Sequence, residues 1–133
     1  MKVTYFEIIS YKVSANWSLD GGDCDAVVKL WVTDEKAKDK TFHVICSDKD
    51  FVPALFSAFK EALLPCFPKV KGIYLTGYTI KRTNTNLATN VANVAITFSD
   101  NKKEWRELGA STNMTVAVME AIGKAFKKKL GLY

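Results

Sequence analysis

Five consecutive residues, Gly109-Ala110-Ser111-Thr112-Asn113, form the stretch of this sequence whose residue types are best suited to bind a ligand. They stand directly before an Ala-rich amphipathic segment, which predicts a helix from about Asn113 to Lys129. A helix N-terminus has backbone N–H groups without intrahelical partners, and its positive dipole end attracts carboxylates. Gly109 would let a ligand approach the backbone, whereas Ser111 or Asn113 can cap the helix. The pattern predicts a carboxylate-binding turn, with a simple helix cap as the alternative.

The other reactive side chains do not combine into a catalytic or metal-binding set. His43 is the only histidine, so no second imidazole can share a metal with it, and it lies inside a predicted strand. The acidic pairs in Asp23-Cys24-Asp25 and Asp48-Lys49-Asp50 are typical of turns and helix caps. Ser57 and Lys60 have the SxxK spacing of some serine acyl enzymes, but they lie inside a predicted helix and lack the companion motifs. We therefore expect no enzymatic activity from this chain alone, no metal site and no cofactor.

Length and composition are those of one ordinary globular domain spanning residues 1–133. The chain is 48% hydrophobic and 25% charged, and no apolar run reaches the roughly 18 residues that would indicate a membrane span. The N-terminal residues alternate and do not form a signal peptide, so we expect a soluble, cytoplasmic protein. The cysteines Cys24, Cys46 and Cys66 are odd in number and lack CxxC spacing, which argues against disulfides and zinc.

A net charge of +5 makes nucleic acid one partner to consider. However, Lys124 and the run Lys127–Lys129 lie in the last turns of the predicted helix, where cations interact favourably with the helix dipole. The chain also lacks the interleaved aromatic residues or a motif of a known RNA-binding fold. Nucleic-acid binding is therefore the weakest of three functional hypotheses.

An internal repeat organises the sequence. Residues Ser10–Val32 resemble Gly77–Phe98, and Val52–Leu63 resembles Thr115–Phe126 at a constant offset of 63. In each half the apolar period changes from two to 3.6, which indicates strands followed by a helix. The sequence therefore predicts an α+β domain made of two tandem βββα units, about residues 1–66 and 70–133, with antiparallel strands packed with two helices and an internal pseudo-two-fold.

The apolar pattern also predicts the bounds of the elements. In the first unit we expect strands at Tyr5–Ser14, Ala26–Thr33 and Thr41–Cys46, then a helix from Phe51 that Pro65 and Pro68 terminate. In the second unit we expect strands at Gly72–Lys81, Val91–Phe98 and Glu104–Leu108 before the second helix. Strict alternation along the first strand places Phe6 and Ile8 on the face opposite Tyr11 and Val13.

The segment KKEWRELGASTNMTVAVMEAI resembles the end of the C-terminal regulatory domain of the 2-isopropylmalate synthase and citramalate synthase family. That pattern is a Trp-bearing strand, then Gly-x-Ser-x-Asn and a small-residue helix. The segment GYTIKRTNTNLATNVANVAI is similar to the part of the family domain that precedes it. The resemblance implies a feedback-regulatory domain that dimerises and binds leucine or isoleucine at the dimer interface. Its catalytic partner would be a separate synthase barrel, for which this chain has no room.

The resemblance also implies the ligand-binding residues. Gly109, Ala110, Ser111 and Asn113 match the pre-helix loop of the family, and Asn86, Ala88, Asn90 and Ala92 match the small-residue segment that faces it. Tyr78 begins the strand that leads to this segment. The alternative is an interaction or assembly module of the same fold without a ligand, motivated by the bulkier, acidic first-half turn Cys46–Asp50.

Overall fold

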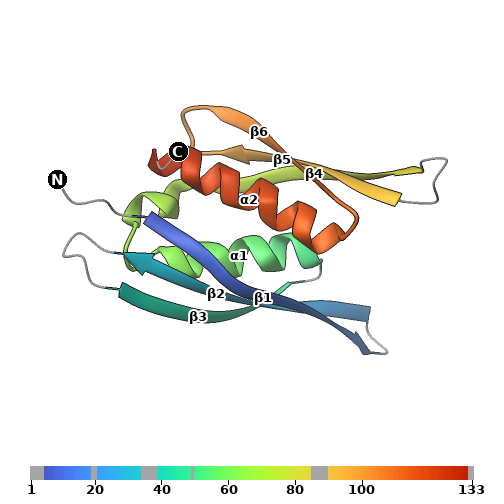
Figure 1. The fold of residues 1–133 in the computed structure, drawn as a ribbon, viewed down its shortest axis with the longest axis horizontal. Coiled ribbons are helices and arrows are strands. Elements are labelled where there is room, and N and C mark those ends of the chain that lie inside the picture. Colours follow the sequence, from blue (N-terminus) through green and yellow to red (C-terminus); the bar gives the residue numbers. More distant parts are fainter. Residues whose placement is uncertain (1–4, 19–20, 34–38, 49, 85–89, 132–133) are drawn as a thin grey trace. The chain divides into compact units, whose positions relative to one another are not determined.

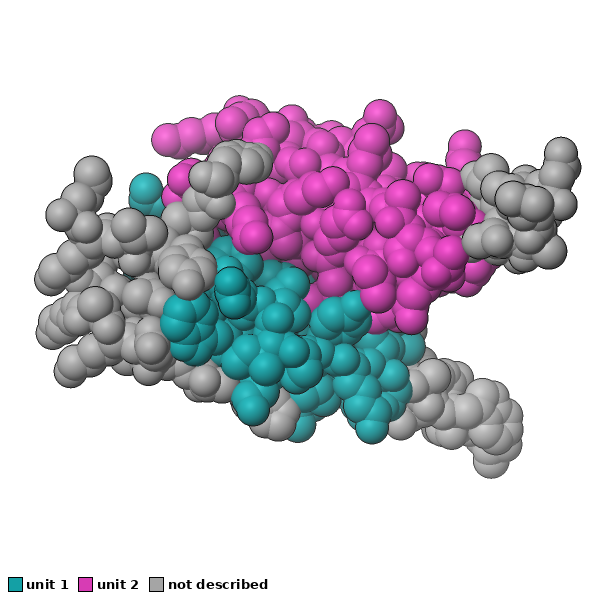
Figure 2. All heavy atoms as spheres, in the orientation of Figure 1, with its two compact units in different colours: residues 1–71, 132 teal, residues 72–131, 133 magenta. Residues whose placement is uncertain are grey.

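The computed structural model describes residues 5–18, 21–33, 39–48, 50–84 and 90–131 of the chain. It is a mixed α+β protein with two antiparallel three-stranded sheets and two α-helices (Figure 1). The chain divides into two compact units, Met1–Lys71 and Gly72–Gly131 (Figure 2). Each unit has the element order strand, strand, strand, helix. No helix in the described part of the chain has the length and apolar character needed to cross a membrane.

Unit 1 consists of a meander sheet covered by one helix. Its strands β1 (Tyr5–Ser18), β2 (Gly21–Thr33) and β3 (Asp39–Asp48) lie in the order β1-β2-β3, and α1 (Phe51–Leu63) packs mainly on β2 and β3. The core forms where buried strand residues meet the apolar side of α1, as in the edge-to-face contact of Phe6 with Phe59 at 5.6 Å between ring centroids.

A capping Asp and nearby prolines set the ends of helix α1. The Asp50 side chain accepts a hydrogen bond from the Phe51 N–H at 2.7 Å and caps the N-terminus. Pro53 lies in the first turn, where its missing N–H costs nothing. Pro65 follows the helix end, as predicted, and Pro68 opens the short 3-10 helix η1 (Pro68–Gly72) that leads to unit 2.

Unit 2 has the same plan. Its strands β4 (Tyr74–Asn84), β5 (Asn90–Ser99) and β6 (Glu104–Ser111) lie in the order β4-β5-β6, and α2 (Met114–Leu130) packs on β5 and β6. Alternate β5 residues Ala92, Val94, Ile96 and Phe98 are buried under the helix. Gly131 closes α2 with a left-handed φ of 69°, and its N–H bonds to the carbonyls of Lys127 and Lys128.

The predicted faces of β1 were wrong because the strand contains a β-bulge. The pairing with β2 shifts between Ile8 and Ser10, so that Ile8 pairs with Leu30 and Tyr11 with Val28. Since Leu30 and Val28 are both buried, Ile8 and Tyr11 lie on the same face of the sheet. A strict period of two cannot reveal an inserted residue, which moves all later side chains to the other face.

Several strands are longer than their apolar patterns indicate. β1 continues to Ser18 and β2 begins at Gly21, although the sequence predicted a loop from 15 to 25. The most consequential difference is β6, which runs through Gly109 and Ala110 to Ser111 instead of ending at Leu108. Backbone pairing with β5 holds these residues in the sheet, because ladder hydrogen bonds do not depend on apolar side chains. Only Thr112 and Asn113 form the turn before α2.

Candidate functional site

The turn between β6 and α2 is a well-formed helix cap. The Asn113 side-chain oxygen accepts hydrogen bonds from the N–H groups of Thr115 at 2.9 Å and Val116 at 3.3 Å. The Ser111 hydroxyl in turn accepts the Asn113 N–H at 3.1 Å. Two of the amides that would attract a carboxylate are therefore satisfied by Asn113. A carboxylate that binds them has to replace the Asn113 carboxamide.

Gly109 is used for close packing between strand and helix. It is buried, and a methyl group added at its Cα would overlap the carbonyl group of Ala117 and stand 3.3 Å from the backbone nitrogen of Ala121. Ala117 and Ala121 lie on the buried face of α2. The absence of a side chain at Gly109 thus brings α2 against β6, and the helix fills the space directly above it.

The sheet brings only some of the predicted ligand-binding residues together. Ala92 is buried on β5 and pairs with Ser111 on β6, next to the pair of Val94 with Gly109. These residues lie near the capped turn at Asn113. Ala110 is exposed, on the face of the sheet opposite that of Gly109.

Tyr78 lies farther along the sheet. Tyr78 pairs with Ile96, four residues along β4 from Arg82, which pairs with Ala92. This spacing separates Tyr78 from the Ala92 pair by about 13 Å along the strand. Asn90 opens β5 opposite Asn84. Asn86 and Ala88 lie outside the described residues, so the facing segment predicted from the sequence is described only from Asn90 onward.

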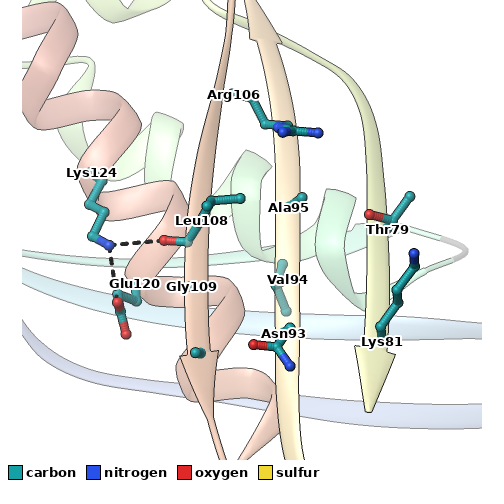
Figure 3. A pocket seen from close by; sticks show the side chains of 11 residues that line it. Thr79, Lys81, Asn93, Val94, Ala95, Arg106, Leu108, Gly109, Glu120 and Lys124 are labelled. Carbon is teal, nitrogen blue, oxygen red and sulfur yellow. Dashed lines mark hydrogen bonds and ion pairs between the residues drawn. The ribbon is translucent and has the colours of Figure 1, made fainter. Parts of the chain in front are cut away.

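The sequence did not predict a hollow on the face of the β4-β5-β6 sheet opposite α2. Figure 3 shows side chains that line this hollow, whose volume is about 430 Å³. It is lined from β4 by Thr79 and Lys81, from β5 by Asn93, Val94 and Ala95, from β6 by Arg106, Leu108, Gly109 and Ala110, and from α2 by Glu120 and Lys124. We call this space the Ala95 hollow, after the small residue on the central strand that lines it.

The two sides of the Ala95 hollow differ in electrostatic character. At the β6 edge, Lys124 donates to Glu120 at 3.1 Å and to the carbonyl oxygen of Leu108 at 2.9 Å. Its charge is thus compensated, and it covers a backbone acceptor of the edge strand. Over the sheet, by contrast, Lys81 and Arg106 are exposed and form no ion pair with any residue that the structure describes.

A second charged cluster joins the β5–β6 turn to the end of α2. Asp100 accepts a bond from the Lys129 ammonium at 2.9 Å, and from the backbone N–H groups of Lys103 and Lys102 at 2.9 and 3.0 Å. The hydrogen bond from Lys129, followed by those two N–H groups, holds the pKa of Asp100 well below its usual range. This cluster connects the β5–β6 turn to α2 within unit 2, because all three donors bond to the Asp100 carboxylate.

Two buried polar atoms on the helix side of β6 are without a hydrogen-bond partner among the described residues. They are Nε1 of Trp105 and Oε2 of Glu107. Both side chains alternate with Gly109 on the same side of the strand, and Trp105 stacks on Phe98 at 6.0 Å between centroids. Such atoms normally bond to water or to another polar group. The sequence offered no signal for them beyond the polar alternation of β6.

The other candidate residues from the sequence are parts of helices and strands. Asp50 caps α1, whereas Asp48 is exposed at the end of β3. Ser57 and Lys60 lie within α1, as expected. Within the described ranges, no three His, Cys, Asp or Glu side chains gather closely enough to hold a metal ion. No model of a known protein family matches this chain.

Proposed function

We propose that this chain is an allosteric amino-acid-binding and dimerisation domain, resembling the feedback-regulatory domain of 2-isopropylmalate and citramalate synthases. The observation that carries the proposal is the same strand-to-helix junction in both units. In unit 1, β3 ends at Asp48, Asp50 caps the helix and α1 begins at Phe51. In unit 2, β6 ends at Ser111, Asn113 caps the helix and α2 begins at Met114. Each step in unit 2 follows its counterpart at the offset of 63 read from the sequence.

A duplicated origin for the two units is further supported by their bulges. The register of β1 with β2 shifts between Ile8 and Ser10, and that of β4 with β5 shifts between Leu75 and Gly77. Both irregularities occupy the first strand of their unit, near its beginning. Because bulges are specific features of a fold, two at equivalent places favour an internal pseudo-two-fold repeat. A repeat of this kind is part of the regulatory domain that the sequence resembles.

In the proposed complex, the ligand carboxylate binds at the N-terminus of α2. It takes the N–H groups of Thr115 and Val116 from Asn113, which turns outward to meet the ligand. The branched side chain of leucine or isoleucine packs on the small-residue end of β5; because Ala92 is fully buried there, α2 has to move away from the sheet to admit it. The dimer interface completes the site, and differential affinity for two arrangements of the dimer transmits the signal to a catalytic synthase domain.

The test is a thermal-shift titration of the purified chain with leucine, isoleucine and valine. A ligand that binds only the native state stabilises it by mass action and so raises the melting temperature. At a ligand concentration of a hundred times Kd, the free energy of unfolding rises by roughly 2.7 kcal/mol. We expect a saturable rise with leucine or isoleucine and none with glycine, which has the same charged groups but no side chain. No rise with any of them at millimolar concentration would contradict amino-acid binding.

An assembly module without a ligand is the second candidate, and the cap itself favours it. Asn113 already satisfies Thr115 and Val116, so the helix N-terminus is complete without a carboxylate. Sedimentation equilibrium separates the two candidates when combined with the titration. A dimer that no amino acid stabilises would identify an assembly module, whereas a dimer with a selective thermal shift would identify the sensor.

A further inference from the structure

The register of the sheet explains why the Ala95 hollow forms. Ala95 pairs with Thr79 on one side and Leu108 on the other, so a short side chain on the central strand lies between two longer ones. These three residues share the face opposite α2, because their neighbours Val94 and Gly109 are buried under the helix. The volume of about 430 Å³ lies within the range of small-molecule sites.

Two cations, Lys81 and Arg106, lie on either side of Ala95 on this face of the sheet. Lys81 pairs with Asn93 and Arg106 with Thr97, which are two residues from Ala95 along β5 in opposite directions. Their Cα atoms are thus about 13 Å apart along the strands and roughly 10 Å apart across them. Figure 3 shows Arg106 reaching across β5, and Lys81 running along β4 toward Thr79; both side chains line the hollow.

Charge compensation distinguishes these two cations from the others around them. Lys124 is held by Glu120, and Lys129 by Asp100. Lys81 and Arg106 line the hollow and form no ion pair with any described residue. A planar guanidinium and an ammonium that border one hollow suit an oxygen-bearing anion, since charge-assisted hydrogen bonds are about twice as strong as neutral ones.

We infer that the Ala95 hollow binds a small molecule bearing a carboxylate or phosphate group. The acid group lies between Arg106 and Lys81, and an apolar body covers Ala95 and contacts Leu108, whose side chain is 56% exposed. The Thr79 hydroxyl lies on the same face and offers a further hydrogen bond. The two cations of this site come from β4 and β6 on the sheet face opposite the helix, whereas the proposed amino-acid carboxylate binds at the N-terminus of α2; Gly109 and Ala110 are common to both sites.

The test follows backbone amide signals of the full chain by NMR during titrations with benzoate and phenyl phosphate. The two probes share a ring and differ in the acid group, and benzamide supplies the same ring without a charge. We expect saturable shifts centred on Asn93, Ala95 and Leu108 with a Kd on the order of 1 mM. The probe with the lower Kd shows whether the site prefers a carboxylate or a phosphate.

Substitutions then assign the binding to the two cations. Arg106→Gln and Lys81→Gln should each weaken binding about tenfold, because each removes a charged partner. Lys102→Gln removes an exposed charge from the β5–β6 turn, outside the hollow, and should leave Kd unchanged. Equal binding of benzamide, equal losses in all three variants, or the absence of saturable shifts in the wild-type chain would each overturn the proposal. Because the two variants lie on different strands, misfolding of one leaves the other as a test.

Discussion

Asp100 shows how a single carboxylate can connect a turn to a helix end. Its pKa is lowered by the bond from Lys129 and by the N–H groups of Lys103 and Lys102. A group whose pKa is lower in the folded state stabilises the fold above its unfolded pKa, about 4 for Asp, and loses that effect as pH falls further. We therefore predict that Asp100→Asn destabilises the chain at pH 7 and that its difference from wild type shrinks toward about pH 2. Urea denaturation at a series of pH values measures this difference.

The control for this prediction is Glu104→Gln, which removes an exposed carboxylate of the same unit. Its effect on the free energy of unfolding should be small at neutral pH, since exposed charges contribute little. A constant difference between Asp100→Asn and wild type across the pH series would mean that the carboxylate charge does not stabilise the turn.

At the scale of elements, the junction of β6 and α2 depends on one missing side chain. A Cβ at Gly109 would overlap the carbonyl of Ala117, and a backbone atom cannot rotate away as a side chain does. We predict that Gly109→Ala forces α2 away from β6 and lowers the free energy of unfolding by about 3 kcal/mol. Chemical denaturation of the purified variant measures this loss.

Gly77→Ala is the matched control, because it makes the same change in β4. A Cβ at Gly77 meets no atom within 4 Å, and its φ is not in the left-handed region. Its stability should equal or slightly exceed that of wild type, since alanine restricts the unfolded chain. If Gly109→Ala is as stable as Gly77→Ala, the close contact of strand and helix is not needed for the fold of unit 2.

At the scale of the whole molecule, the distribution of charge matters more than its sum. The net charge of +5 and the pI of about 9.1 favour anionic partners in general. Two lysines of α2 are, however, engaged by Glu120 and Asp100. We predict that single-stranded or duplex nucleic acid does not retain the chain even at low ionic strength, as measured by a salt-titrated binding assay. Retention that weakens steeply with salt would instead indicate phosphate contacts and revive nucleic-acid binding.

The sequence by itself determined the local elements. The change of apolar period located both helices, and the alanines Ala58 in α1 and Ala121 in α2, which are 63 residues apart, are both buried. The sequence also indicated the helix caps, because an Asp or Asn directly before an apolar helical stripe accepts hydrogen bonds from the first N–H groups of the helix. These features depend on contacts close in the chain, so a single sequence contains enough information to find them.

Only the tertiary structure decided the strand ends, the faces of β1 and the Ala95 hollow. Pairing with β5 kept Gly109–Ser111 in β6, and a bulge reversed the expected side of Tyr11. The hollow joins Lys81, Ala95 and Arg106, which come from three strands and become neighbours through register alone. Register depends on backbone pairing between distant segments, and a shift of one residue would move every side chain to the other face. The pattern of apolar residues within one strand does not contain that information.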